Sequence, residues 1–176
     1  MAFSVFRMCS FRGVNNRFGA ATFRAFSTKK PESERKDIVK SVFISQSNDI
    51  FTNLSLEDWM YKNTNFSDQH ILLLWRNDPC VVIGRHQNPW VEANIPYLTE
   101  VGIPLARRNS GGGTVYHDRG NLNLSFFSTK ENYNRKYNLE LIVRALFREF
   151  GVNAVVNNRH DIIVKDKYKV SGTAAK

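Results

Sequence analysis

The chain has 176 residues, of which 42% are hydrophobic, which is enough for one buried core and one domain. No apolar run approaches the roughly 18 residues of a membrane helix, and two cysteines, Cys9 and Cys80, cannot build a disulfide framework. The formal net charge of +9 would suit nucleic acid. However, the first 30 residues hold six of the 25 basic residues and none of the 16 acidic ones. The rest of the chain is therefore nearly balanced, and we expect neither nucleic acid nor a membrane as a partner.

The first 26 residues have the composition of a mitochondrial targeting sequence. They contain spaced arginines, small residues and phenylalanines but no acid, and Arg-Ala-Phe-Ser resembles a processing site after Phe26. We therefore assign residues 1–26 to a transit peptide, residues 27–40 to a disordered tether and residues 41–176 to the folded domain. This organisation predicts a location in the mitochondrial matrix, with a basic RNA-binding arm as the alternative.

Short apolar runs after residue 40 predict strands joined by polar turns. In chain order, the predicted strands cover residues 41–45, 70–75, 80–84, 105–108, 114–117, 121–128, 154–156, 161–164 and 168–171. Within residues 121–128, Leu122, Leu124 and Phe126 should lie on one face, and Asn123, Ser125 and Phe127 on the other.

Helices are predicted over residues 50–62, 96–102 and 138–150. Asp49 should cap the first helix, with Ile50, Leu54 and Trp59 facing inward and Glu57 and Asp58 outward. Strands outnumber helices, and we expect several of them to be joined by hairpins rather than by helical crossovers. The pattern predicts an α+β fold, with a mixed, largely antiparallel sheet and flanking helices.

The segment Arg-Arg-Asn-Ser-Gly-Gly-Gly-Thr-Val-Tyr-His-Asp, over residues 107–118, carries the strongest sign of a binding site. Three consecutive glycines weaken a strand, so they indicate a place where backbone N–H groups approach an anion closely. Two preceding arginines suit phosphate or carboxylate. A Walker loop and a dinucleotide fingerprint are both excluded, since no Gly-Lys-Ser/Thr and no helix follows. A nucleotide-like ligand site and a structural glycine-rich turn both stay open.

Two shorter motifs flank this segment: Gly-Arg-His-Gln-Asn-Pro-Trp over residues 84–90, and Lys-Val-Ser-Gly-Thr-Ala over residues 169–174. Taken in order, the three motifs resemble those of lipoate–protein ligases, and most of all the mitochondrial lipoyltransferase branch of that family. The resemblance runs from about residue 41 to residue 176. It implies the catalytic-domain fold of biotin and lipoate protein ligases, which is similar to the core of class II aminoacyl-tRNA synthetases.

The resemblance also implies residue roles. Lys169 would be the catalytic residue, touching both the acyl carbonyl and the phosphate of lipoyl-AMP, where a cation stabilises developing charge. The ligand contacts implied by the family are Arg108, Ser110, Gly111, Gly112, Gly113, Thr114, Val115, Tyr116, Arg159 and Lys169. His117 and Asp118 do not form a general-base dyad in this interpretation, because adjacent strand residues point to opposite faces.

The function implied by the resemblance is acyl transfer. A lipoyl group would move from lipoyl-AMP, or from a lipoylated carrier such as the glycine cleavage H protein, to a lysine of the lipoyl domains of 2-oxoacid dehydrogenase E2 subunits. We expect a monomer with no metal and no tightly bound cofactor. The alternatives are a lipoate–protein ligase that uses ATP and Mg²⁺, and an inactive chain that only binds the adenylate.

Two departures bear on these expectations. Octanoyltransferases of the thioester type carry a nucleophilic cysteine near the last motif, whereas this chain has Ser171-Gly172-Thr173-Ala174 there, which argues against a covalent acyl-enzyme. Members of the family continue beyond the lysine motif. We therefore expect residues 41–176 to be the N-terminal part of the catalytic domain.

Overall fold

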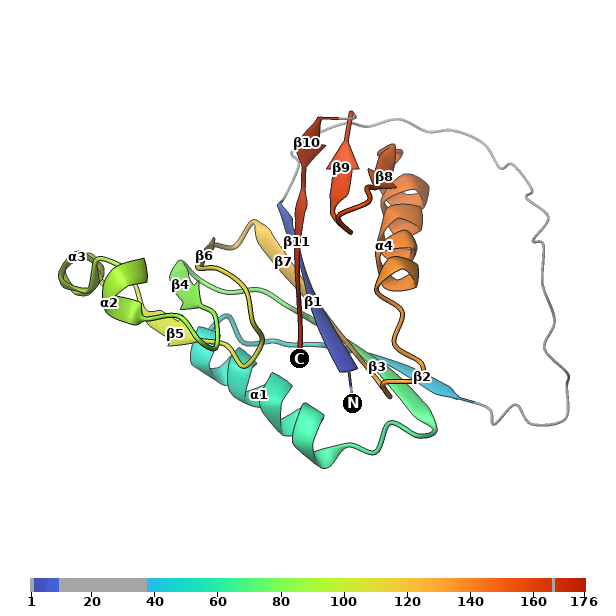
Figure 1. Ribbon diagram of the computed structural model, residues 1–176, viewed down its shortest axis with the longest axis horizontal. Helices are drawn as coiled ribbons and strands as arrows, with labels where there is room; N and C mark the ends of the chain where they lie inside the picture. The colour runs from blue at the N-terminus through green and yellow to red at the C-terminus, as the bar shows by residue number, and fades with distance from the viewer. Residues whose placement is uncertain (1, 10–37, 166) are drawn as a thin grey trace, which may run out of the picture.

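A computed structural model of the protein describes residues 2–9, 38–165 and 167–176. It shows an α+β arrangement in which three sheets are flanked by helices (Figure 1). The α+β class and the mixed, largely antiparallel pairing agree with the sequence prediction, but the strands are divided among three sheets rather than one. The largest sheet has the strand order β11-β1-β7-β3-β2, with β2 and β3 parallel and the other neighbours antiparallel. Its strands are β1 (Ala2–Cys9), β2 (Val39–Ile44), β3 (Gln69–Trp75), β7 (Asn121–Ser128) and β11 (Ser171–Ala175).

Two three-stranded sheets lie beside it. One is antiparallel and contains β8 (Ala154–Val156), β9 (Ile162–Val164) and β10 (Tyr168–Lys169). The other contains β5 (Leu105–Arg107), β4 (Cys80–Ile83) and β6 (Val115–His117), with β4 between its parallel neighbour β5 and its antiparallel neighbour β6. We call this second one the small sheet.

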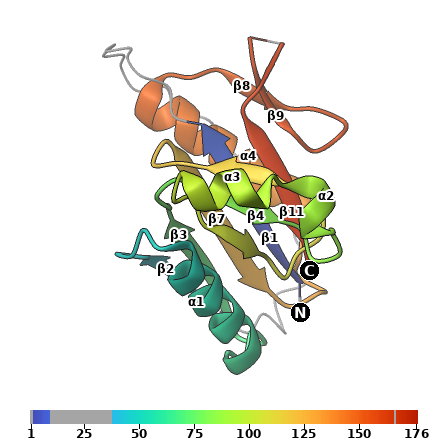
Figure 2. The ribbon, with the colours of Figure 1, turned by 90° about the vertical axis from the view of Figure 1, so that its left-hand side faces the viewer.

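Four helices are described: α1 (Ile50–Asn63), α2 (Pro89–Glu92), α3 (Ile95–Glu100) and α4 (Arg135–Phe150). The short helices α2 and α3 cover the small sheet on the side that faces the viewer in Figure 2. No helix in the described part of the chain has the length and apolar character needed to cross a membrane.

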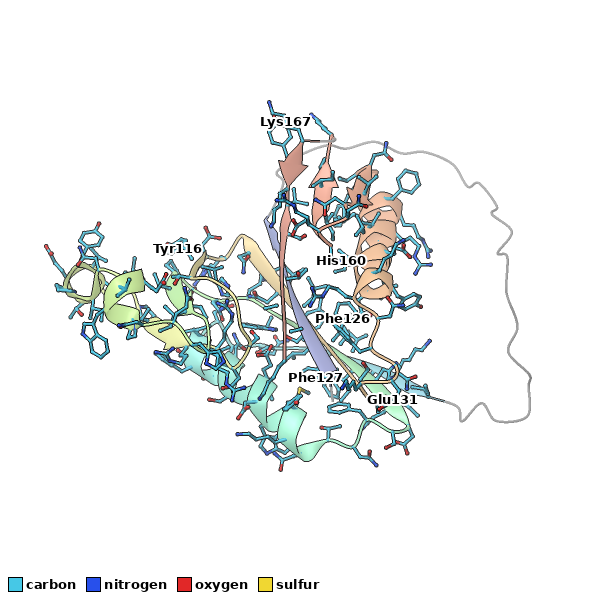
Figure 3. All side chains as sticks on the ribbon, in the orientation of Figure 1. Tyr116, Phe126, Phe127, Glu131, His160 and Lys167 are labelled. Carbon is cyan, nitrogen blue, oxygen red and sulfur yellow. The ribbon has the colours of Figure 1, made fainter. Side chains whose placement is uncertain are left out.

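The large sheet separates two apolar cores. On one face, Phe127 and Trp75 pack with Ile50 of α1, and on the other Leu124 packs with Leu139 of α4. Neighbouring side chains on β7 therefore enter different cores, and Figure 3 shows Phe126 and Phe127 on opposite sides of the strand. The alternation predicted for residues 121–128 is confirmed.

The helix boundaries follow from their caps. Asp49 accepts a hydrogen bond from the Thr52 backbone N–H at 2.7 Å, as predicted. Gly151 ends α4 in the left-handed conformation, with φ of 64°. The predicted inward face of α1 is right for Ile50 and Leu54, which belong to or pack against the core. It is wrong for Trp59, which is 60% exposed, and for Glu57, which was expected outside but is only 4% exposed. The buried face carries polar groups, which a search for apolar spacing overlooks.

The predicted strands over residues 70–75 and 80–84 follow one another through a polar turn, but they do not pair as a hairpin. The strands β3 and β4 form there, but β3 pairs with β2 and β7, whereas β4 pairs with β5 and β6. The polar connection between them turns the chain from one sheet into another. This change of sheet brings the residues of the connection beside α1 and β6.

Two strands bear on the predicted domain boundaries. The strand β2 begins at Val39, two residues before the expected start of the folded domain. The strand β1 lies between β7 and β11 and comes from the segment assigned to the transit peptide. The processing site after Phe26 and most of the expected tether lie outside the described residues. Removal of residues 1–26 stays a prediction.

Candidate active site

The centre of the site is the connection between β5 and β6, residues 108–114, which we call the glycine loop. Its backbone is tied to the end of β4, because Arg108 N–H donates to Ile83 O and Arg85 N–H donates to Ser110 O, both at 3.0 Å. A Cβ added to Gly84 would lie only 2.0 Å from Gly112 O. Glycine at position 84 is therefore what allows the motif over residues 84–90 to lie against the glycine loop.

Both arginines before the glycines hold backbone carbonyls. The guanidinium of Arg108 donates to the carbonyls of Val82, Gly111 and Gly113 at 2.7 to 3.3 Å. One nitrogen of Arg107 donates to the carbonyls of residues 84, 85 and 87 at 2.7 to 3.1 Å. Burial lowers the pKa of Arg108, and the carboxylate of Glu57 opposes this. The arginines therefore shape the two loops, and Arg108 places a half-buried positive charge beside the glycines.

The glycine loop also presents unused hydrogen-bond donors. Within the described residues, the N–H groups of Gly111, Gly112 and Gly113 donate to no protein acceptor. Ser110 is 2% exposed, and its hydroxyl has no hydrogen-bond partner among the described residues. A buried hydroxyl without a partner costs free energy in the empty protein. An incoming carbonyl or phosphate oxygen would satisfy it.

A pocket of about 210 Å³ continues from the far end of the glycine loop. Thr114, Val115 and Tyr116 line it together with Glu92 and Tyr97. The Thr114 hydroxyl lies 3.0 Å from Gln87 Oε1 and 3.2 Å from Glu92 Oε2, which joins the glycine loop to the preceding motif. Ligand pockets commonly have about 300–1,000 Å³, so this one suits a fragment of a ligand rather than a whole adenylate.

Asp58 of α1 links the glycine loop to Lys176, the residue that follows β11. Its Oδ1 accepts a hydrogen bond from Asn109 Nδ2 at 2.7 Å and lies 3.3 Å from Lys176 Nζ. The ammonium of Lys176 also lies 4.2 Å from the centre of the Tyr61 ring. The hydrogen bond from Lys62, followed by that from Lys176, lowers the pKa of Asp58 below its usual value. A carboxylate thus joins α1, the glycine loop and β11.

The structure does not bring every predicted site residue to this loop. Lys169 is 58% exposed, and its ammonium pairs with Asp161 at 2.9 Å. Arg159 is exposed on the turn before β9. Neither makes a hydrogen bond or ion pair with the glycine loop within the described ranges. Figure 3 shows Lys167, two residues before Lys169, at the outer tip of β9 and β10.

A buried polar chain behind the glycine loop was missed at the sequence level. Trp75 Nε1 donates to Ser125 Oγ at 2.9 Å, and Ser125 Oγ donates to Glu57 Oε1 at 2.5 Å. Burial raises the pKa of Glu57 to about 7, against the opposing hydrogen bond from Ser125. The available signal was the series Asn121, Asn123 and Ser125 on one face of an otherwise apolar strand.

His117 and Asp118 have separate environments, in agreement with the interpretation that they form no dyad. His117 is buried beside Trp75, with the ring centroids 6.2 Å apart. Asp118 is exposed, and its Oδ1 accepts a hydrogen bond from Gly120 N–H at 2.9 Å in the turn before β7.

Comparison with known proteins agrees with this geometry. Residues 49–176 match the lipoyl protein ligase A/B catalytic domain. The chain belongs to this family. Human mitochondrial lipoyl amidotransferase is 50% identical over 149 residues, which cover 83% of this chain and 40% of that protein. A lipoate-protein ligase A from Psychrobacter cryohalolentis is 48% identical over 124 residues, which cover 70% of this chain and 36% of that protein.

Solved structures of the family share the fold. A Plasmodium falciparum protein, LipL1, in complex with lipoate aligns with a TM-score of 0.63 and 32% identity, over 77% of this chain and 46% of that one. Lipoate-protein ligase A bound with ATP aligns with a TM-score of 0.60 and 25% identity, over 79% and 65%. The chain thus spans about 40% of the curated human relative and belongs to the family through its catalytic domain.

Glu57 should make the stability of this family member depend on pH. Its pKa rises from 4.5 in the unfolded chain to about 7 when folded, so the folded state holds the extra proton between these values. Stability is highest below the lower pKa and falls as pH rises through the upper one. Glu57→Gln keeps the acceptor for Ser125 without the charge. Measured by urea unfolding, the free energy of unfolding of the variant minus that of the wild type should rise by about 2–3 kcal/mol from pH 5 to pH 8. The same difference at both pH values would contradict the prediction.

Gly84→Ala should force the two loops apart, since the new methyl group would overlap the carbonyl of Gly112. We expect a loss of about 1–3 kcal/mol in the free energy of unfolding. Gly111→Ala is the matched control, because nothing lies within 4 Å of its added Cβ. Equal unfolding midpoints for the two variants would show that the close approach does not constrain position 84.

Proposed function

We propose that this chain acts in protein lipoylation as an acyltransferase, binding lipoyl-AMP at the glycine loop and passing its lipoyl group to a lysine of an acceptor domain. The main support is the set of unused donors: three adjacent N–H groups and the buried Ser110 hydroxyl, above the Arg108 guanidinium. A phosphate–acyl anhydride offers the oxygens that such donors need. The proposed ligand contacts comprise Arg108, the glycine loop through Thr114, Val115 and Tyr116, Arg159 and Lys169.

The chemistry requires stabilisation of two oxygens. The neutral acceptor amine attacks the acyl carbonyl carbon, the new C–N bond forms, and the bond from that carbon to the phosphate oxygen breaks. AMP leaves, and the amine loses a proton. Negative charge develops on the carbonyl oxygen and then on the leaving phosphate, where fixed donors have the greatest effect.

Arg108 acts in this proposal by positioning the loop. Its hydrogen bonds to the carbonyls of Gly111 and Gly113 turn the acceptors of the loop toward the protein, while the N–H groups stay available. Its half-buried charge also favours an anion at the loop. A ligand would therefore meet N–H donors first and the guanidinium charge behind them.

Lys169 is proposed as the catalytic cation, which leaves Asp161 when the adenylate binds. In the present ion pair the Lys169 side chain is 58% exposed and the Asp161 side chain 13% exposed, so solvent reaches the ammonium but much less of the carboxylate. The adenylate phosphate carries one negative charge and the departing AMP carries two, so the phosphate becomes a stronger partner for Lys169 as the reaction proceeds. Arg159 has no polar partner for its side chain in the described part of the chain and would add a second positive charge. Catalytic hydrogen bonds often form only in the complex.

The substrates and location are proposals that extend from the relatives. The similarity to human mitochondrial lipoyl amidotransferase supports a mitochondrial matrix location, with residues 1–26 as the targeting segment. From the family resemblance of the motifs, we further propose E2 lipoyl domains of 2-oxoacid dehydrogenases as acceptors and the glycine cleavage H protein as another lipoyl donor. Lipoyl-AMP enters as a substrate rather than as a tightly bound cofactor.

A second candidate is the full ligase reaction, in which lipoate and ATP form the adenylate first. It is favoured by the solved relative that binds ATP and by the bacterial lipoate-protein ligases. Lipoate-dependent exchange of pyrophosphate into ATP, measured with Mg²⁺, separates the two reactions. Exchange supports the ligase, and transfer from lipoyl-AMP without exchange supports the transferase alone.

Lys169→Ala should lower transfer of the lipoyl group from lipoyl-AMP to a lipoyl domain by about 100-fold or more, because one preorganised charge at the reacting oxygen is lost. The exposed Lys165 on the same hairpin provides the control, and Lys165→Ala should leave the rate unchanged. The assay follows the mass of the acceptor domain with time. Equal rates for the wild type and Lys169→Ala would remove Lys169 from the mechanism.

Ser110→Ala should have opposite effects on stability and binding. The empty protein loses a buried hydroxyl without a partner, so its free energy of unfolding should stay equal or rise. Affinity for a non-hydrolysable lipoyl-adenylate analogue, measured by calorimetry, should fall about tenfold, as for one lost hydrogen bond. Ser125→Ala, whose hydroxyl has two buried partners, should instead destabilise the fold. Unchanged affinity in Ser110→Ala would exclude its hydroxyl from the ligand site.

A further inference from the structure

We propose that Asn77 is a positioning residue that holds His117 as the neutral tautomer with its proton on Nε2, and thereby fixes the strand that follows the glycine loop. Asn77 lies in the connection between β3 and β4, and both its side chain and that of Asn53 are fully buried. The tautomer follows from the hydrogen bonds alone. Its effect on ligand binding rests on the function proposed above.

The assignment begins at backbone carbonyls, which can only accept. Asn53 Nδ2 lies 3.0 Å from both Ser47 O and Arg76 O, so this end of the side chain must be the NH₂ group. The other end then accepts, in agreement with the hydrogen bond from Ser45 Oγ to Asn53 Oδ1 at 2.6 Å. The orientation of Asn53 is therefore determined.

The same NH₂ group determines the orientation of Asn77. Asn53 Nδ2 donates to Asn77 Oδ1 at 2.9 Å, so the remaining end of Asn77 is its own NH₂ group. That group faces His117 Nδ1 at 2.9 Å. An NH₂ group has no lone pair to offer, so His117 Nδ1 must accept the hydrogen bond, and the proton of the neutral imidazole is on Nε2.

The hydrogen bonds from Asn53 to Asn77 and from Asn77 to His117, which we call the relay, connect three parts of the fold that form the site. Asn53 belongs to α1, which also carries Asp58, the acceptor for Asn109 of the glycine loop. His117 is the last residue of β6, whose first residue, Val115, directly follows that loop. Through Asn77, the helix therefore holds the strand on one side of the loop, as Arg108 holds the loop from beneath.

The imidazole also meets the second buried polar chain. Its ring packs edge-on against Trp75, which donates to Ser125, and Ser125 in turn donates to Glu57. A proton on Nδ1 would face the Asn77 donor and would require both amides to turn over. Reversal of the Asn53 side-chain amide would then place its oxygen against the backbone carbonyls of Ser47 and Arg76. These two acceptors therefore oppose reversal of the hydrogen bonds.

The test is nitrogen NMR of the whole chain labelled with ¹⁵N-histidine, at a pH where neutral imidazole predominates. The chain has four histidines, and the spectrum of His117→Gln identifies the resonances of His117. We expect an unprotonated Nδ1 and a protonated Nε2. A protonated Nδ1 in the wild type would overturn the inference, and this measurement requires no folded Asn77 variant.

Two variants test the positioning role. Asn77→Asp replaces the donor with an acceptor, so the proton should appear on Nδ1, and affinity for the lipoyl-adenylate analogue should fall about tenfold. Asp78→Asn is the control: its exposed partner is Arg119, and it should change neither result. If Asn77→Asp does not fold, Asn77→Ala, which removes the donor without adding charge, should show the same loss of affinity.

The outcomes are distinct. An unchanged tautomer in Asn77→Asp would contradict the relay, and normal affinity in a folded Asn77 variant would contradict the positioning role. If the wild-type chain bound no adenylate analogue, the proposed function and the positioning role would both fail. The protonated Nε2 would still stand in that case, because it depends only on the buried hydrogen bonds.

Discussion

The close contact of two loops at the end of β4 is the constraint on which the rest of the site depends. Gly84 lies against the carbonyl of Gly112, and Arg108 fills the space beneath the glycines with hydrogen bonds to their carbonyls. A peptide whose carbonyl is held in this way presents its N–H elsewhere. The glycines thus allow the backbone conformation and the close approach of the two loops. Arg108 holds the glycine carbonyls in this conformation, so the N–H groups of the loop stay available.

Much of the fold followed from the sequence because local rules determine it. The cap at Asp49, the stop at Gly151 and the two faces of β7 depend on neighbouring residues alone. The failures depend on distant partners. Glu57 is buried because Ser125, 68 positions away, donates to it, and β3 and β4 separate because each finds better partners in another sheet. No local pattern contains such information.

The candidate site divides in the same way. Glycine-rich and basic motifs indicated the loop, and the structure joins residues 84–90 to it as neighbours. The roles of the two arginines were not predictable, because a guanidinium before a glycine run suits a ligand phosphate and a backbone carbonyl equally well. The buried asparagines were overlooked for another reason, since single asparagines in a sequence are typical of surface positions. Only the hydrogen bonds between Asn53, Asn77 and His117 offset the free-energy cost of burying their polar side chains.

The position of Lys169 is best understood from the two ends of its segment. At one end, Lys176 is 19% exposed and held by both Asp58 and the Tyr61 ring, close to the glycine loop. At the other, Lys169 is exposed and has only Asp161 as a partner within the described residues. One end is thus anchored beside the glycine loop, while the other is held by a single ion pair whose ammonium is exposed to solvent. The proposed mechanism therefore requires the adenylate phosphate to replace Asp161 as the partner of Lys169, while Lys176 keeps the far end of β11 beside the glycine loop.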